Sequence, residues 1–179
     1  MNYSRLYFTK NGLNGIVTMY NFTYNEFFKY LKKNQKISKQ FDLNMKNDFK
    51  NQEKSDPPKS IIVMWQNNKN LKKKNIKFCI LIYKNNYVGG FRYYKTNKPF
   101  PEENIELGIK KYIKIQIVYI VPKYRRLGLG FKMLRRFIKK NNTYILYVSN
   151  ANKKALQLYT KLGFNIKNKD NDGYILFHQ

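Results

Sequence analysis

Nine residues, Pro122-Lys123-Tyr124-Arg125-Arg126-Leu127-Gly128-Leu129-Gly130, connect a predicted strand to a predicted helix. The strand is expected over Tyr112 to Val121, because this run is rich in β-branched and aromatic residues and is followed by a proline. The helix is expected next, because residues of one face recur at helical spacing: Gly130, Met133, Leu134, Phe137 and Ile138.

The glycine-rich turn has the composition of a phosphate-binding site. A turn that enters a helix presents backbone N–H groups that can hold a pyrophosphate, and Lys123, Arg125 and Arg126 add positive charge. Two rival motifs do not fit. A dinucleotide fingerprint needs a third glycine where Met133 stands, and a P-loop needs a Gly-Lys-Ser/Thr sequence that the chain lacks. A tight turn without a ligand is the alternative interpretation.

A second motif is separated from the first by this helix and by one predicted strand: Asn152-Lys153-Lys154-Ala155-Leu156-Gln157-Leu158-Tyr159-Thr160-Lys161-Leu162-Gly163-Phe164. With it, the chain resembles the GNAT superfamily of N-acetyltransferases. The segment Tyr124 to Gly130 looks like motif A of that superfamily, Arg/Gln-x-x-Gly-x-Gly/Ala. The segment Asn152 to Phe164 looks like its motif B, Asn-x-x-Ala-x-x-Leu-Tyr-x-x-x-Gly-Phe. The resemblance covers roughly Ile76 to Gln179.

The resemblance implies an α/β (α+β) fold, a single domain with a central, mostly antiparallel sheet flanked by helices. The sheet is expected to splay open in a V between the strand ending near Val121 and a strand over Tyr144 to Val148, with acetyl-CoA in the gap. The residues implied to bind its pantetheine arm are Val118, Tyr119, Ile120 and Asn152. Those implied to bind its pyrophosphate are Arg125, Arg126, Leu127, Gly128, Leu129, Gly130 and Phe131.

The position of Tyr159 in motif B implies that this residue is the proton donor of the reaction. Aminolysis of a thioester needs a proton for the departing thiolate, whose pKa of about 8.5 makes a phenol near 10 a usable donor. The alternative is a packing aromatic, since Tyr159 also lies on the apolar stripe of a helix predicted over Ala151 to Leu162. A backbone N–H of the Val118 to Ile120 segment is the expected donor to the oxyanion.

The residue at the usual position of the general base differs from the family pattern. Many members carry a glutamate on the strand before motif A, and the corresponding residue here is Lys114. Glu103 and Glu106, together with Glu102, lie in the loop predicted before this strand and are the remaining carboxylate candidates. A solvated acidic loop is the alternative for them, and a water chain is another route for deprotonating the amine.

The remaining elements are expected within one domain, 1–179. Residues 1–75 are expected to form a divergent, helical part on the acceptor side, and residues 76–179 the acetyl-CoA-binding core. Helices are predicted over Tyr24 to Lys33, with Thr23 as N-cap, and over Ile37 to Phe49. Loops are predicted over Asn47 to Ser60 and Thr96 to Glu106. Further strands are predicted over Ser60 to Trp65, Ile76 to Tyr83, Tyr87 to Tyr94 and Tyr174 to Phe177.

Composition excludes several classes of function. The 179 residues contain no apolar run long enough for a membrane span and no signal peptide, so a cytoplasmic or nuclear protein without membrane association is expected. The one cysteine, Cys79, lies in an apolar run and is expected to be buried and inert. The one histidine, His178, is next to the last residue, which argues against Cys–His catalysis and against a metal site.

The net charge of +26 comes almost entirely from lysine, which is typical of AT-rich coding sequence. Such a charge also attracts anions, among them coenzyme A, nucleotide sugars and nucleic acid, and repels polycations. We expect an N-acetyltransferase that acts on a primary amine of an amino sugar, another small molecule or a peptide. Dimers are common among the proteins it resembles, so a homodimer is considered. The alternative, not favoured, is a basic module that binds nucleic acid or protein with little catalysis.

Overall fold

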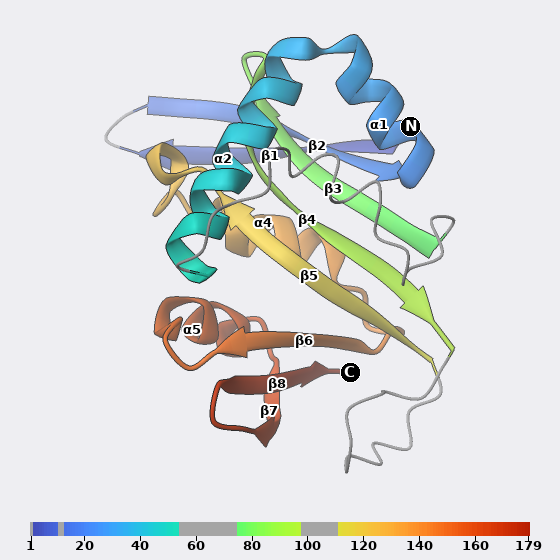
Figure 1. Cartoon of the computed structure of the whole chain (residues 1–179), viewed down its shortest axis with the longest axis vertical. Coiled ribbons are helices and arrows are strands. Elements are labelled where there is room, and N and C mark those ends of the chain that lie inside the picture. The colour runs from blue at the N-terminus through green and yellow to red at the C-terminus, as the bar shows by residue number, and fades with distance from the viewer. Residues whose placement is uncertain (1, 11–12, 54–74, 98–110) are drawn as a thin grey trace.

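The fold is that of a computed structural model, which describes residues 2–10, 13–53, 75–97 and 111–179. Within them one eight-stranded sheet has the order β1-β2-β3-β4-β5-β6-β8-β7 (Figure 1). All strand neighbours are antiparallel except β5 and β6. The expected mixed, mostly antiparallel fold is confirmed. The strands are β1 (Asn2–Lys10), β2 (Leu13–Thr23), β3 (Ile76–Tyr83), β4 (Asn86–Thr96), β5 (Tyr112–Ile120), β6 (Tyr144–Ser149), β7 (Asn165–Lys169) and β8 (Gly173–His178).

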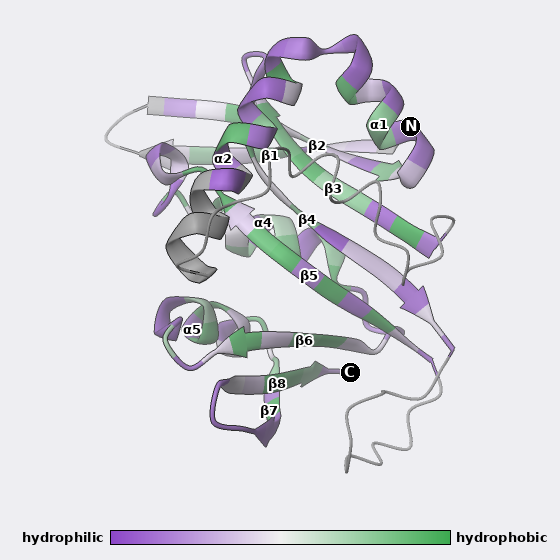
Figure 2. Cartoon of the chain, in the orientation of Figure 1, coloured by the Kyte–Doolittle hydropathy of each residue, from purple (hydrophilic) through white to green (hydrophobic). Residues whose placement is uncertain are grey.

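Helices cover both faces of the sheet. They are α1 (Tyr24–Lys33), α2 (Gln35–Glu53), the short 3-10 turn η2 (Pro122–Tyr124), α4 (Leu129–Phe137) and α5 (Lys153–Lys161). Consecutive strand residues point to opposite faces, and Cys79 packs in the core beneath α4 and α5 whereas Ile80 packs with α1 and α2. The sheet therefore separates two hydrophobic cores. In Figure 2 the strands β3, β5 and β6 carry much of the hydrophobic colour, and α1 and α2 show hydrophilic segments.

Strands β5 and β6 separate along their length. Their parallel ladder contains the pairs Ile113 with Tyr144 and Lys114 with Ile145, and the two strands then diverge, as Figure 1 shows. A bulge in β5 accompanies the divergence: Ile117 has φ of 53°, and the register with β4 shifts at this point. The splay that the family resemblance implied is thus present in the chain, with its closed end at Lys114.

The helix α1 has the predicted bounds and cap. The hydroxyl of Thr23 accepts a hydrogen bond from the Glu26 N–H, and the Glu26 carboxylate accepts one from the Thr23 N–H, which completes a capping box. The next helix continues to Glu53, so the loop predicted from Asn47 was wrong over its first residues. A helix that has already formed can be extended by polar residues whose side chains interact four positions apart. In α2, Asp42 and Lys46 form such an ion pair, with a distance of 3.2 Å.

The first residues form a β-hairpin that the sequence analysis missed. The whole of β1 pairs with β2, from Asn2 opposite Asn21 to Lys10 opposite Leu13. Leu6 and Phe8 are buried, but Tyr3 and Tyr7 are exposed aromatics on the other face. Because apolar residues occupy both faces of β1, the two-residue alternation that marks a strand is obscured. The description of residues 1–75 as a helical part is therefore wrong over β1 and β2.

Other differences are small. The helix α4 ends at Phe137, one residue before the last member of its predicted face, because Ile138 already has an extended backbone, and β7 was not predicted. The predicted strand Ser60 to Trp65 and nearly all of the predicted loop Thr96 to Glu106 lie outside the described residues. Among the residues that are described, no helix is both long and apolar enough to cross a bilayer. The same part of the chain holds no group of three His, Cys, Asp or Glu residues able to bind a metal ion.

Candidate active site

The turn between β5 and α4 presents backbone N–H groups to solvent. Gly128 is the N-cap of α4 with φ of 70°, and Arg126 also has a left-handed backbone with φ of 63°. In the described structure no side chain caps this helix, so the N–H groups of Leu129, Gly130 and Phe131 are left at its positive end. This arrangement suits an anion, as the sequence predicted for the turn.

Arg125 ties this turn to the end of β5. Its Nε–H donates a hydrogen bond of 2.8 Å to the Ile120 carbonyl, and its guanidinium lies 5.5 Å from the centre of the Tyr119 ring. The side chain is exposed, and Arg125 precedes Gly128, the N-cap of α4, by three residues, so it adds positive charge to the turn that leads into this helix. Arg125 thus joins the two segments predicted to bind the cofactor.

The gap-facing edge of β5 carries backbone donors. The Val121 N–H donates to the Val88 carbonyl of β4 over 2.8 Å. Because N–H groups alternate in direction along a strand, those of Val118 and Ile120 point away from β4 and toward the gap. They lie beyond Lys114, the last β5 residue that pairs with β6. The chain therefore offers donors and acceptors along the segment expected to hold a pantetheine arm.

Tyr159 is a buried residue of the core beneath α4 and α5. Its side chain is 6% exposed and packs edge-on against Phe164, with ring centroids 5.8 Å apart. Burial raises the pKa of its hydroxyl well above the ordinary value for tyrosine. Within the part of the chain that the structure describes, the hydroxyl makes no hydrogen bond. The packing role considered for Tyr159 is present, and its proton-donor role stays a prediction.

Asn152 has a structural role that the sequence analysis did not predict. Its side-chain oxygen accepts a hydrogen bond of 3.1 Å from the Ala155 N–H, so it is the N-cap of α5. Since Asn152 is exposed and the cap uses only the oxygen, the two N–H bonds of its amide group are not needed for capping, and the predicted contact with the pantetheine arm stays a prediction.

Two substitutions of Asn152 separate these tasks. Asn152→Ala is expected to lower the free energy of unfolding by about 1 kcal/mol, because the cap is lost. Asn152→Asp keeps a capping oxygen and should retain stability, but it removes the NH2 donor and should weaken acetyl-CoA binding about fivefold. Denaturant unfolding and calorimetry measure the two effects. Unchanged affinity in Asn152→Asp would limit the residue to capping.

Gly128 provides a second test of the turn. Gly128 has φ of 70°, a conformation that is unfavourable for residues with a Cβ. Gly128→Ala is therefore expected to cost about 1 kcal/mol of stability and to weaken cofactor binding, although the space around the added Cβ is open. Gly128→Asn should lose less, because asparagine tolerates this conformation. Gly130→Ala is the control, since its Cβ would lie at an ordinary 3.7 Å from both Ile120 and Leu158. Equal stability of all three variants would contradict the expectation.

The general base is not located. Glu103 and Glu106 lie outside the described residues. Lys114 is half-buried on β5 between its cross-strand neighbours Tyr94 and Ile145, so no carboxylate stands at that position. The sequence analysis also passed over Arg92, a buried residue of β4 whose Nε–H donates to Gln116 Oε1 over 3.1 Å. An arginine inside an otherwise apolar and aromatic strand was the signal that could have revealed it.

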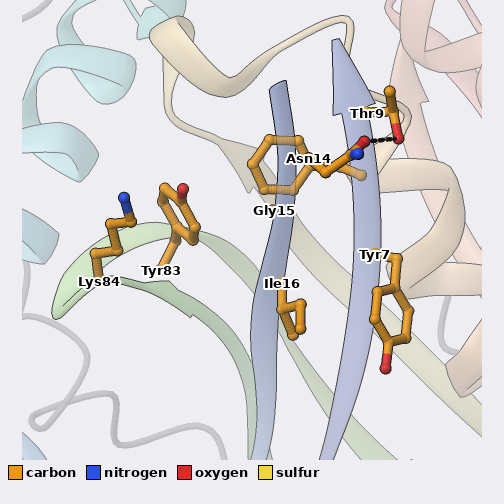
Figure 3. A pocket seen from close by; sticks show the side chains of 8 residues that line it. Tyr7, Thr9, Asn14, Gly15, Ile16, Tyr83 and Lys84 are labelled. Carbon is orange, nitrogen blue, oxygen red and sulfur yellow. Dashed lines mark hydrogen bonds between the residues drawn. The ribbon is translucent and has the colours of Figure 1, made fainter. Parts of the chain in front are cut away.

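A separate hollow of about 700 Å³ lies at the far end of the β1–β2 hairpin. Figure 3 shows Tyr7 and Ile16 on one side of it and Tyr83 and Lys84 on the other, with a hydrogen bond of 2.7 Å between Thr9 and Asn14. The residues that line it are Tyr7, Phe8, Thr9, Asn14, Gly15, Ile16, Tyr83 and Lys84. It contains none of the residues predicted to bind cofactor or to act in catalysis.

Comparisons with known proteins agree with this geometry. The model of the acetyltransferase (GNAT) family matches residues 39–164. No curated protein matches the chain. Arabidopsis thaliana NAA60 is similar in its complex with a bisubstrate analogue, with a TM-score of 0.54 and 15% identity over 75% of this chain and 89% of that one. Its complex with acetyl-CoA has a TM-score of 0.55 and 13% identity, covering 75% and 91%. At these identities the likeness shows a shared fold.

Proposed function

The chain belongs to the acetyltransferase (GNAT) family and is an acyltransferase, and on that premise we propose that it acetylates a primary amine by direct attack in a ternary complex with acetyl-CoA. The observation that carries the proposal is the divergence of β5 from β6 beside the N-terminus of α4, which has no side-chain cap. The expected acceptor is an amino sugar, another small amine or a peptide.

The chain's residues fit the cofactor in charge and hydrogen-bonding capacity. The N–H groups from Arg126 to Phe131 would hold the pyrophosphate, with Arg125 beside them, because a helix N-terminus and a guanidinium both favour phosphate. The gap-facing backbone of Val118 and Ile120 would hold the pantetheine arm. Acetyl-CoA supplies an activated acetyl thioester when bound.

Three groups of the chain are proposed to act on the reaction. A gap-facing N–H of Val118 or Ile120 would donate to the acetyl carbonyl oxygen, where negative charge develops. Tyr159 would give its proton to the departing sulfur, and its raised pKa keeps it protonated at neutral pH. Glu106, Glu103 or a water chain would take the proton of the amine.

Titration calorimetry with acetyl-CoA and with desulpho-CoA, followed by a thiol-release screen of amines, tests the function. The assay has no background from the protein, because Cys79 is fully buried and burial raises the pKa of its thiol. We expect both cofactors to bind and an amine to be turned over. If neither acetyl-CoA nor desulpho-CoA binds, the proposed acetyl transfer is refuted. The alternative is then a basic module that binds nucleic acid or protein.

A further inference from the structure

The hairpin of β1 and β2 exposes tyrosines on one face of the sheet. Leu6 and Phe8 belong to the core beneath α4 and α5, so the odd-numbered residues of β1 point to the opposite face by alternation. Tyr3 and Tyr7 on that face are each 63% exposed, and Ile16 is 47% exposed. We use the name hairpin face for six residues that pair across the two strands: Tyr3 with Tyr20, Arg5 with Thr18 and Tyr7 with Ile16.

The helices on this side of the sheet cover only one end of the hairpin face. Tyr30 of α1 packs against Tyr20, with ring centroids 6.0 Å apart. The helix α2 packs further along the sheet, where Phe41 contacts Tyr87 of β4 with centroids 5.3 Å apart. Tyr7 lies toward the turn of the hairpin, and Figure 1 shows this end of β1 and β2 extending past α2. Most of the hairpin face is therefore accessible to a partner.

Positive charge is interleaved with these rings. Arg5 lies between the two exposed tyrosines of β1 and is itself exposed. The hollow at the end of the hairpin continues this surface, with Tyr7 on one side and Tyr83 and Lys84 on the other (Figure 3). The Lys84 ammonium lies 5.4 Å from the centre of the Tyr83 ring. Since the first 23 residues contain no aspartate or glutamate, the hairpin itself carries only positive charge.

The chemistry of this surface matches unpaired nucleotides. Aromatic rings on an open sheet face stack on bases, and cations between them neutralise the phosphates. Tyr3 and Tyr7 are about 14 Å apart along β1 at 3.4 Å per residue, which is long enough for more than one base. The net charge of +26 attracts a polyanion and opposes association of two copies of the chain. An anionic membrane would also be attracted, but the hairpin face offers it one aliphatic side chain, Ile16.

We propose that the hairpin face binds single-stranded nucleic acid. Bases stack on Tyr3 and Tyr7, and Arg5 and Lys84 contact the phosphates. None of these four residues belongs to the proposed cofactor site, so this binding is independent of acetyl transfer. RNA and single-stranded DNA share the chemistry that the face recognises, and the experiment separates them.

Fluorescence anisotropy with labelled oligonucleotides tests the proposal. The probes are a short oligouridine, an oligothymidine of the same length and a DNA duplex of that length. Tyr3→Ala and Tyr7→Ala remove a ring, and Tyr7→Phe is the matched control that keeps it. Arg5→Met and Lys84→Met remove a charge from the proposed surface. Lys167→Met removes the same charge from an exposed residue of β7, at the other edge of the sheet.

The wild-type protein is expected to bind a single strand more tightly than the duplex. Charge alone would favour the duplex, which carries more charge per unit length, so the reverse order reports stacking. Tyr3→Ala and Tyr7→Ala should each weaken single-strand binding about tenfold, and Tyr7→Phe should bind like the wild type. The tighter of the two single strands identifies RNA or DNA as the ligand.

The dependence on salt tests the two cations. Arg5→Met and Lys84→Met should each reduce the slope of log affinity against log salt by about 0.7, the value for one phosphate of a single strand, whereas Lys167→Met should keep the slope. Duplex binding as tight as single-strand binding, or full affinity in both alanine variants, would overturn the proposal. So would a dimer in sedimentation, or binding to phosphatidylserine vesicles, that Tyr7→Ala abolishes while single-strand affinity is unchanged, because the face would then serve a second copy or a membrane.

Discussion

Replacement of Tyr159 by phenylalanine is expected to lower kcat about a hundredfold, the usual contribution of a positioned proton donor. The free energy of unfolding should change little, because the hydroxyl makes no hydrogen bond within the described structure and the ring keeps its contact with Phe164. Thiol release at saturating substrates measures the first effect and denaturant unfolding the second. A kcat within twofold of the wild-type value would make Tyr159 a packing residue.

Tyr144→Phe is the matched control for this experiment. Tyr144 is also a buried tyrosine, but its hydroxyl accepts from the Lys139 N–H over 2.9 Å and donates to the Phe137 carbonyl over 3.4 Å at the end of α4. Its loss should cost about 1 kcal/mol of stability with little effect on kcat. The two variants therefore separate a hydroxyl that stabilises the fold from one that is proposed to act in the reaction.

The pH dependence follows from the direction of the Tyr159 shift. Because burial raises its pKa, the hydroxyl stays protonated throughout the range in which a free tyrosine is neutral, up to about pH 10. The rate should therefore not fall through loss of this proton below that pH. A decline in kcat between pH 8 and pH 10 that vanishes in Tyr159→Phe would contradict the raised pKa.

Gly89→Ala is expected to give the largest loss of stability, about 3 kcal/mol. A Cβ at Gly89 would collide with the Tyr119 carbonyl oxygen and would lie 3.0 Å from the Ile120 Cα, so β4 would be forced away from β5. The displaced residues are those proposed to hold the pantetheine arm, so affinity for desulpho-CoA should fall as well. Unfolding and calorimetry measure both. Gly130→Ala is the control, because the added Cβ would meet only side chains, at ordinary distances. If Gly89→Ala loses no more stability than Gly130→Ala, the expected collision is refuted.

Local chemistry made the elements around the motifs predictable. The strand β5 and the helix α1 were predicted within about one residue of their bounds, because β-branched runs, helical spacing and a capping box act over a few neighbouring residues. The phosphate-binding turn could be inferred for the same reason, since its glycines and arginines are contiguous. The hairpin of β1 and β2 was missed, because aromatic residues on both faces hide its period.

The sequence by itself determined the family, the mixed fold and the order of the segments proposed to bind the cofactor, since each depends on residues close together in the chain. The tertiary structure alone decided which distant residues meet. It set the divergence of β5 from β6, the burial of Tyr159 and the pairing of Arg92 with Gln116, which are 24 positions apart. These features depend on strand register and on which face of the sheet is covered, and neither quantity is encoded in any short stretch of residues.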